Sequence, residues 1–296
     1  MTTTEGGLPS TRRRRVGQFL FRAGALASLV LIVGPALWLV VGVVVHAVPH
    51  WRWSVLTTSS TPAGGGLENA ILGSIQLMVG VALVAGSVGV LAGIYLAGLL
   101  RRHHGGKERG AVFRTAIEVL SGFPSIVLGY VGFVALVVGL HWGLSLLPAV
   151  LILSMMVVPY IAKATEAALR QVPTSYVEGA EALGMSTGYA LRKVVLRSAL
   201  PGIVTGLLIA LAIAGGETAP LLYTGGWTNN LPGAALTHHQ VAYLTYPVWT
   251  WFNYPSNEFR YLSYDAALLL LVMVLLLLVT ARIIVARTQR HAERRA

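Results

Sequence analysis

The sequence predicts an all-α integral membrane protein with six transmembrane helices and both termini in the cytoplasm. Three observations support this fold class: few residues are charged, the apolar runs are long enough to span a bilayer, and the basic residues are unevenly placed. Of the 296 residues, 55% are hydrophobic and 11% are charged, whereas about a quarter of the residues in a soluble domain are charged. A lipid environment explains this deficit, and the cell (inner or plasma) membrane is the expected location.

Six apolar segments are long enough to cross the membrane, because an α-helix needs about 20 such residues to do so. These segments are residues 23–48, 69–100, 117–140, 144–162, 200–224 and 264–285. The second is longer than the bilayer requires, so it is expected to tilt. The link between the third and fourth, around His141 and Gly143, predicts a tight helical hairpin. Pro124 is expected to bend the third segment.

The basic residues indicate the topology. Twenty of the 22 lysines and arginines fall in four groups of five, and only Arg52 and Arg260 lie elsewhere. The groups occupy residues 12–22, 101–114, 163–197 and 282–295. Six helices place both termini and the second and fourth connections on one face, which the positive-inside rule makes cytoplasmic. The net charge of +11 is therefore a topology signal, and no nucleic-acid partner is expected.

The chain is expected to form one transmembrane domain, residues 19–288, with its core in residues 69–285. A disordered basic tail (residues 1–18) precedes it, and a short cytoplasmic tail (residues 289–296) follows it. The apolar run after the basic N-terminus is too long for a signal peptide. The chain has no cysteine, and its paired histidines lack acidic partners at ligand spacing, so no metal site is expected.

The outer connection between the fifth and sixth segments is long and aromatic. Its aromatic residues include Trp227, Tyr243, Tyr246, Trp249, Trp251 and Tyr254. Because tryptophan and tyrosine are enriched at the membrane–water interface, we expect these side chains to be interfacial anchors. A ligand-binding role is the less favoured alternative.

The cytoplasmic connection between the fourth and fifth segments predicts a short helix. Pro173 ends the preceding helix, and Ser175 and Glu178 have the Ser-x-x-Glu spacing of a capping box. Gly184 then ends the new helix, since glycine readily takes the left-handed conformation found at helix C-termini. The helix is expected to have about eight residues and a length of about 12 Å.

This short helix is expected to dock a partner protein. Its small residues Gly179, Ala180 and Ala182 permit close approach, and Glu178 and Glu181 are placed to pair with cations of the partner. The alternative is a helix that rests on lipid headgroups. Such helices carry a Trp-, Phe- or Leu-rich face and are basic rather than acidic, so docking is favoured.

Glu217 lies in the outer part of the fifth segment, about 25 Å from its inner end. An acid at that depth normally faces a partner helix or water. Thr218 follows it, and Pro220 is expected to kink the helix, because proline removes a backbone hydrogen bond. Two interpretations remain open: a gate or pore element, and a structural hydrogen bond between helices. At the inner boundary, Arg114 and Glu118 are expected to pair, since they lie four residues apart.

The cytoplasmic connection resembles that of the permease subunits of binding-protein-dependent ABC importers. In that family it carries Glu-Ala-Ala, then a glycine, then an aliphatic pair. The corresponding residues here are Glu178-Gly179-Ala180, Gly184, and Val194 with Leu196. The resemblance implies that the short helix seats in a groove of a separate ATPase and is the coupling helix. Gly179 stands where an alanine is usual.

Three further stretches resemble the phosphate-specific, PstA-type branch of this family. They are residues 118–129, 159–166 and 215–222, and the resemblance extends over roughly residues 70–225. It implies import of inorganic phosphate. On that basis we expect Lys163 and Glu166 at the inner mouth of the substrate pathway, and Glu217, Thr218 and Pro220 are the candidate gate residues. Family members often carry a cation about one turn before Gly216. Here residues 211–214 are apolar, so the pore cations are expected from a partner permease.

The resemblance also implies the partners: a PstC-type permease subunit, a PstB-type ATPase dimer and an external PstS-type phosphate-binding protein, in addition to membrane lipid. The chain itself is expected to be non-catalytic and without a cofactor. It lacks the Gly-x-x-x-x-Gly-Lys-Ser/Thr loop that holds ATP and Mg²⁺, so the partner ATPase is expected to bind both. Two alternatives are a permease for another oxyanion, such as sulfate or molybdate, and an ion-coupled secondary transporter. Secondary transporters tend to contain inverted repeats, and no repeat is evident here.

Overall fold

The computed structural model describes residues 11–98 and 106–293, and its contacts divide the chain into two compact units. The first, Met1–His50, contains α1 (Thr11–Ala47) and one 3-10 turn (Val48–His50). Residues 11–18, expected in the disordered tail, therefore lie in α1, while residues 1–10 fall outside the described residues. The apolar side chains of α1 are exposed on all sides, as suits a helix surrounded by lipid or by partner chains.

The second unit, Trp51–Ala296, holds the remaining described elements. After a 3-10 turn (Trp53–Leu56), β1 (Ser60–Thr61) pairs antiparallel with β2 (Gly64–Gly65). The helices that follow are α2 (Glu68–Leu96), α3 (Gly106–Ser121), α4 (Ser125–Gly132), α5 (Leu146–Arg170), α6 (Thr174–Ala182), α7 (Thr187–Ala190), α8 (Leu196–Gly216), α9 (Ala219–Thr224), α10 (Thr245–Thr250) and α11 (Asn257–Glu293). Two π-helical segments, Phe133–Gly139 and Leu191–Val195, extend α4 and join α7 to α8, and a 3-10 turn (Trp251–Asn253) follows α10.

The spans agree with the prediction of six transmembrane helices. Within the described ranges, five spans are long and apolar enough to cross a membrane, and they lie in α1, α2, α5, α7–α8 and α11. The sixth is a pair, α3 and α4, bent by 96°. The predicted hairpin is confirmed, with left-handed backbone at His141 (φ 57°) and Gly143 (φ 67°) before α5 begins. Residues 99 and 100, the end of the second predicted span, lie outside the described part of the chain.

Helix α5 is the centre of the second unit. It packs against α2, where a Cβ atom at Gly89 would lie 2.7 Å from Cβ of Ile161. It also packs against α8, where a Cβ atom at Gly202 would lie 2.8 Å from Cβ of Ala168. Such distances are closer than real Cβ contacts, so glycine permits the close approach of these helices. The helix is the most buried of the membrane spans, and its contacts with α2 and α8 hold it in place.

The third predicted span is not one helix, because α3 ends at Ser121 and α4 begins at Ser125. Pro124 precedes α4 as its N-cap, with φ −59° and ψ 132°. Proline donates no backbone hydrogen bond and disfavours helical geometry in the residue before it. The predicted bend at Pro124 is therefore confirmed, but the span is broken rather than curved.

The fifth predicted span, residues 200–224, is also wrong as a single helix. α8 ends at Gly216, and Glu217 has an extended backbone (φ −77°, ψ 135°). A separate helix, α9, then begins at Ala219, with Pro220 in its first turn. Pro220 therefore does not kink a continuing helix. It starts a new one, where its missing N–H would have had no intrahelical partner.

The outer connection does more than anchor the chain at an interface. Tyr243 and Trp251 are 1% and 4% exposed, so the expectation of interfacial anchors is wrong for these two residues. Trp249 and Tyr254 remain exposed, as anchors require. Residues 241–245 are all buried, and α10 begins only at Thr245. The connection therefore returns into the protein as a non-helical segment before α10.

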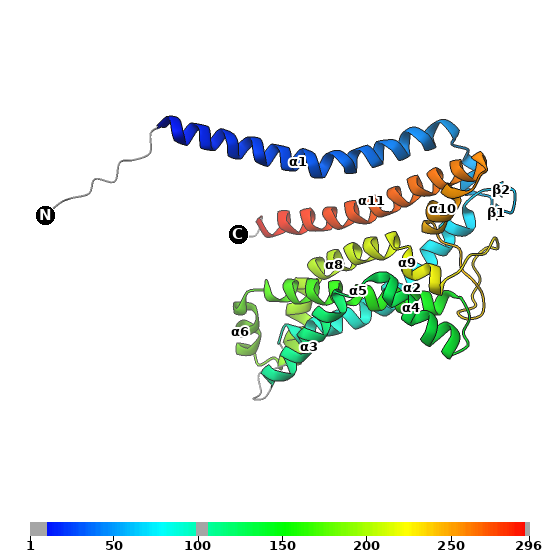
Figure 1. Ribbon diagram of the computed structural model, residues 1–296. Coiled ribbons are helices and arrows are strands. Elements are labelled where there is room, and N and C mark those ends of the chain that lie inside the picture. Colours follow the sequence, from blue (N-terminus) through cyan, green and yellow to red (C-terminus); the bar gives the residue numbers. More distant parts are fainter. Residues whose placement is uncertain (1–10, 99–105, 294–296) are drawn as a thin grey trace. The chain divides into compact units, whose positions relative to one another are not determined.

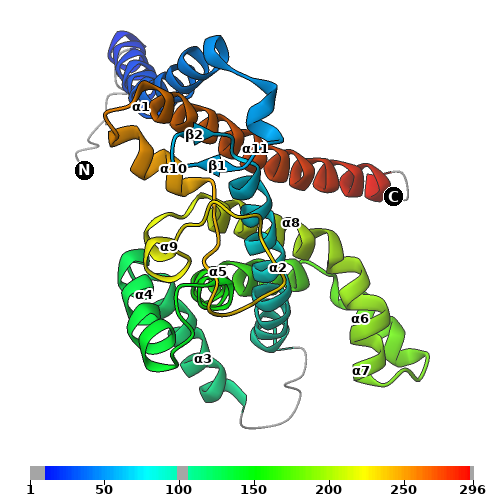
Figure 2. The ribbon, with the colours of Figure 1, turned by 90° about the vertical axis from the view of Figure 1, so that its right-hand side faces the viewer.

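The second unit has two distinct ends (Figure 1). Helix α6 lies at one end of the bundle, and α9, α10 and the β1–β2 hairpin lie at the other. Following the predicted topology, we call these the inner and the outer end. Figure 2 views the outer end, where the chain between α9 and α10 crosses over α5. The Leu147 N–H, in the first turn of α5, donates to the Leu236 carbonyl at 2.8 Å, which fixes this crossing.

Candidate functional site

The two broken spans meet at their breaks. Helix α4 packs directly on α9, so that a Cβ atom at Gly129 would lie 2.6 Å from Cα of Pro220. Next to this contact, the Ser125 side chain interacts with the Glu217 carboxylate. The main-chain carbonyl of Glu217 accepts a hydrogen bond, at 3.0 Å, from Oγ1 of Thr245. Glu217 is thus held from two sides.

We call this place the junction: Ser125 and Pro124 from the third span, and Glu217, Thr218 and Pro220 from the fifth. Pro220 is buried, whereas Ser125, Glu217 and Thr218 are half-buried. The three predicted gate residues therefore lie together at one point, where polar groups remain accessible. The position of Glu217 between two spans agrees with the structural interpretation, and the gate interpretation stays a prediction.

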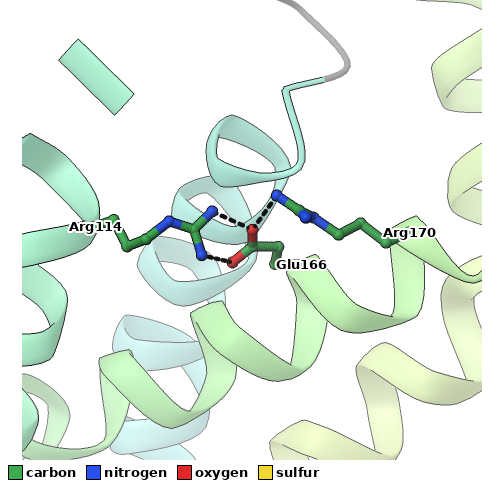
Figure 3. Close-up of polar contacts among 3 residues, drawn as sticks. All are labelled: Arg114, Glu166 and Arg170. Carbon is green, nitrogen blue, oxygen red and sulfur yellow. Dashed lines mark hydrogen bonds and ion pairs between the residues drawn. The ribbon is translucent and has the colours of Figure 1, made fainter. Parts of the chain in front are cut away.

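A second polar cluster lies toward the inner end, around Glu166 of α5 (Figure 3). Its carboxylate accepts from Arg114 Nη2 at 2.5 Å and Nη1 at 3.4 Å, and it lies 2.8 Å from Nη2 of Arg170. The Glu166 side chain is 8% exposed, while the two arginines are 44% and 59% exposed. The carboxylate is buried but doubly compensated, as a buried charge must be. The cluster as a whole carries one net positive charge.

The expected Arg114–Glu118 pair is wrong, because Arg114 reaches across to Glu166 on α5. A two-pronged bond to a buried carboxylate is stronger than a solvent-exposed pair along one helix. Lys163 lies one turn before Glu166, but its ammonium donates to Oγ of Ser121 at 3.4 Å. Both interactions connect α5 to the inner half of the broken third span.

The predicted short helix exists as α6, but it begins differently. Pro173 is its N-cap and no side chain caps it, so the expected capping box of Ser175 and Glu178 is wrong. With Pro173 at the cap, Ser175 is already the second helical residue and its hydroxyl cannot serve as the cap. The end agrees with the prediction, since Gly184 has φ +75°. Ser186 then caps α7 by accepting from the Tyr189 N–H.

The exposed face of α6 contains only part of the predicted docking set. Glu178, Gly179, Ala182 and Gly184 are exposed, and no atom lies within 4 Å of a Cβ built at Gly179. Glu181 is half-buried. Ala180 is 4% exposed, so it packs within this chain and does not admit a partner as expected.

Residues 89–295 match the family model described as the binding-protein-dependent transport system inner membrane component. The chain belongs to this family. It is a multi-pass membrane permease subunit of an importer that works with an ATPase and a binding protein. Over 272 residues, which cover 92% of this chain and 89% of the relative, it is 57% identical to phosphate transport system permease protein PstA 2 of Mycobacterium bovis and of Mycobacterium tuberculosis.

More distant proteins agree with the family and the fold. Phosphate transport system permease protein PstA of Yersinia pestis is 32% identical over 93% of this chain and 91% of its own. Among solved structures, a chain of the inward-facing MetNI methionine ABC transporter matches with a TM-score of 0.59 at 20% identity. That match covers 74% of the permease and 95% of the MetNI chain. It supports the fold of the second unit, which includes most of the matched length.

Several residues that belong to the α6 face, the junction or the Glu166 cluster were not identified from the sequence. Tyr176 and Leu183 are 51% and 79% exposed, and their spacing from Gly179 places all three on one face of α6. Their spacing of three and then four residues is typical of one helix face, and it could have indicated Tyr176 and Leu183 from the sequence. Ser125 was missed because its partner, Glu217, lies on a distant part of the chain. Arg170 was missed although it follows Glu166 by four residues on α5, a spacing that sequence can indicate.

The Glu166 cluster predicts an unequal effect of two identical substitutions. Glu166→Gln should lower the free energy of unfolding by about 1–2 kcal/mol, because the charge that both arginines share is lost while the arginines remain half in solvent. Glu118→Gln, on the exposed surface of α3, should have an effect within about 0.5 kcal/mol. Thermal unfolding of both variants in detergent compares them. Equal effects would contradict the cluster geometry.

Proposed function

We propose that this permease is the PstA-type subunit of an ATP-driven importer of inorganic phosphate. The observation that carries the proposal is 57% identity over 92% of the chain to relatives with that printed name. The polar residues of the junction and the inner cluster support it. They give the apolar bundle a set of groups from which a pathway for a charged solute can be built.

A phosphate ion that crosses the bilayer must exchange its water for other hydrogen-bond donors or cations. From the outer to the inner end, this permease offers the hydroxyls of Thr218, Ser125 and Ser121, and then the ammonium of Lys163. Ser125 and Ser121 flank the break between α3 and α4, so their side chains border the same interruption. A PstC-type permease supplies the remaining cations, because this chain has none in the middle of its spans.

The junction is the gate. Two rigid half-helices, α4 and α9, are packed on each other and each follows a short non-helical link. Short links of this kind act as hinges, because their φ and ψ angles change when the packed helices move as rigid bodies. Glu217, Thr218 and Pro220 lie on one link and at the start of α9, so a motion of α4 and α9 together changes their exposure to the pathway.

Helix α6 is the coupling helix. Tyr176, Gly179 and Leu183 form a face that a groove of the ATPase can receive, with Glu178, Ala182 and Gly184 also exposed for contact. Ala180 and Glu181 support this face from the inside. Helix α5 ends at Arg170, three residues before the N-cap of α6. A pull on α6 therefore reaches α3 through the Arg170–Glu166–Arg114 cluster.

The chain is non-catalytic in this assignment, and it holds no cofactor. ATP and Mg²⁺ bind to a PstB-type ATPase dimer at the inner end. A PstS-type phosphate-binding protein delivers the substrate at the outer end, and membrane lipid surrounds the spans.

The assignment is tested by mild purification of the complex and its reconstitution in liposomes. ATP hydrolysis is expected to rise when phosphate-loaded binding protein is added, and labelled phosphate should enter in an ATP-dependent way. Sulfate and molybdate should neither enter nor compete. Uptake of either of these ions in preference to phosphate would overturn the substrate. Uptake that survives ATPase inactivation but collapses with the ion gradient would overturn the transporter class.

Lys163 is expected to contribute to the inner mouth of the pathway. Lys163→Gln should reduce phosphate uptake about tenfold at unchanged protein level, because one charge-assisted hydrogen bond to the ion is lost. Lys163→Arg keeps the charge and is the matched control, with most of the uptake retained. Unaltered uptake in Lys163→Gln would remove this residue from the pathway.

The exposed face of α6 predicts a size effect at Gly179. Gly179→Arg should leave the permease folded, because nothing lies within 4 Å of the new Cβ, yet it should abolish co-purification of the ATPase. Gly179→Ala is the control and should retain both the ATPase and uptake. An ATPase that stays bound and functional in Gly179→Arg would show that α6 is not the docking element.

A further inference from the structure

Residues 241–245 form an unusual element of the outer end. Val241, Ala242, Tyr243, Leu244 and Thr245 are each at most 3% exposed, and only Thr245 belongs to a helix. Irregular backbone at membrane depth is tolerated only where protein covers it or where it borders a cavity. Val241 and Tyr243 belong to the same apolar cluster as Leu77, Leu153 and Ala214. The segment therefore packs among the spans.

The segment is seated directly on α2. The Leu244 N–H donates to Oγ of Ser74 at 2.9 Å. One residue earlier on α2, Gly73 has no room for a side chain, since its Cβ would collide with the carbonyl oxygen of Ala242. Backbone of the segment thus lies against backbone of the helix. Any change of volume at Gly73 must displace it.

The same segment holds both ends of α9. Oγ1 of Thr245 donates to the Glu217 carbonyl at 3.0 Å, just before α9, and the Val241 N–H donates to the carbonyl of Gly225 at 3.1 Å, just after α9. Tyr243 packs beside Gly225. A half-helix of six residues cannot fix its own position, so the segment determines where α9 and Glu217 lie.

One buried group makes the packed position of this segment less stable. The Tyr243 hydroxyl is buried and has no hydrogen-bond partner within the part of the chain that the structure describes. An unpaired buried hydroxyl disfavours the seated state. Residues 229–240, which precede the segment, are mostly exposed. A partner that binds these exposed residues at the outer end could therefore pull directly on residues 241–245.

We propose that residues 241–245 are a plug, which closes the outer end of the pathway and positions Glu217 at the gate until it is withdrawn from its seat on α2. This inference rests on the proposed importer function, since a plug requires a pathway to close. Thr245, Ser74 and Gly73 are positioning residues in this scheme. They act on the gate through α9, without touching the substrate.

Accessibility of a buried thiol tests the plug. The chain contains no cysteine, so Ala214→Cys, a position buried beside Tyr243, creates a single reporter. In the complex with the partner permease and ATPase, a membrane-impermeant maleimide added from outside should label this thiol slowly. With Gly73→Ala or Thr245→Val, labelling should accelerate about tenfold, as expected when one buried hydrogen bond or contact no longer holds the seat. ATP hydrolysis without binding protein should rise in the same variants.

The chain offers matched controls for both substitutions. Gly86→Ala lies on the same helix, where the new Cβ makes an ordinary contact of 3.4 Å with Leu207. Thr250→Val lies on the same short helix as Thr245, and its hydroxyl donates within that helix, to the Tyr246 carbonyl. Both should leave labelling and ATP hydrolysis unchanged. Labelling that rises equally in controls and plug variants, or in neither, would overturn the proposal.

A cross-link distinguishes a moving plug from a fixed structural segment. Ser74→Cys with Leu244→Cys should form a disulfide on oxidation, which pins the segment to α2. Uptake should then stop and return on reduction, and undiminished uptake by the oxidised form would show that the segment does not move. Thiol labelling and basal ATP hydrolysis can both be measured without knowing which solute is transported, so they test the plug independently of the substrate. If the thiol behaves as expected but phosphate does not enter, the assigned substrate is wrong and the plug stands.

Discussion

The absence of water in the bilayer core is the constraint on which this structure depends. A helix that is interrupted there exposes backbone groups, and each must find a partner in the protein. The permease interrupts two spans and places the interruptions against each other, so that Ser125 and Glu217 bridge them. A third irregular element, residues 241–245, donates hydrogen bonds to the Glu217 carbonyl before α9 and to the Gly225 carbonyl after it. The breaks, the bridge and the re-entrant segment are thus parts of one solution.

In the proposed importer function, the inner end serves to transfer motion from the ATPase. Helix α5 packs against α2 and α8 through glycines of those two helices, and it leads almost directly into α6. At this end its one buried carboxylate, Glu166, binds arginines from α3 and from α5 itself. Apolar packing alone lets helices slide past one another, whereas a two-pronged charged bond has a preferred geometry. Under that proposal, the cluster would make α3 follow α5, while the break at Pro124 would let α4 move differently.

The two ends are linked by the broken third span. Its inner half is tied to α5 by the Glu166 cluster, and its outer half is packed on α9. A rotation at residues 122–124 would therefore be felt at Glu217 without any change in the packed core of α2, α5 and α8. In this scheme, displacement of α6 and withdrawal of the plug act on the same junction from opposite ends of the molecule.

The sequence by itself determined the class of protein, the number of spans, the position of the short helix α6 and the residues around Glu217. Apolar length, charge placement and proline or glycine positions are local properties, and they sufficed for these features. Only the tertiary structure decided that Arg114 binds Glu166 instead of Glu118, that Ala180 faces inward, and that Tyr243 is buried. Each of these outcomes depends on which distant surface a side chain meets. That is settled by the packing of whole helices, which spacing along a single helix does not encode.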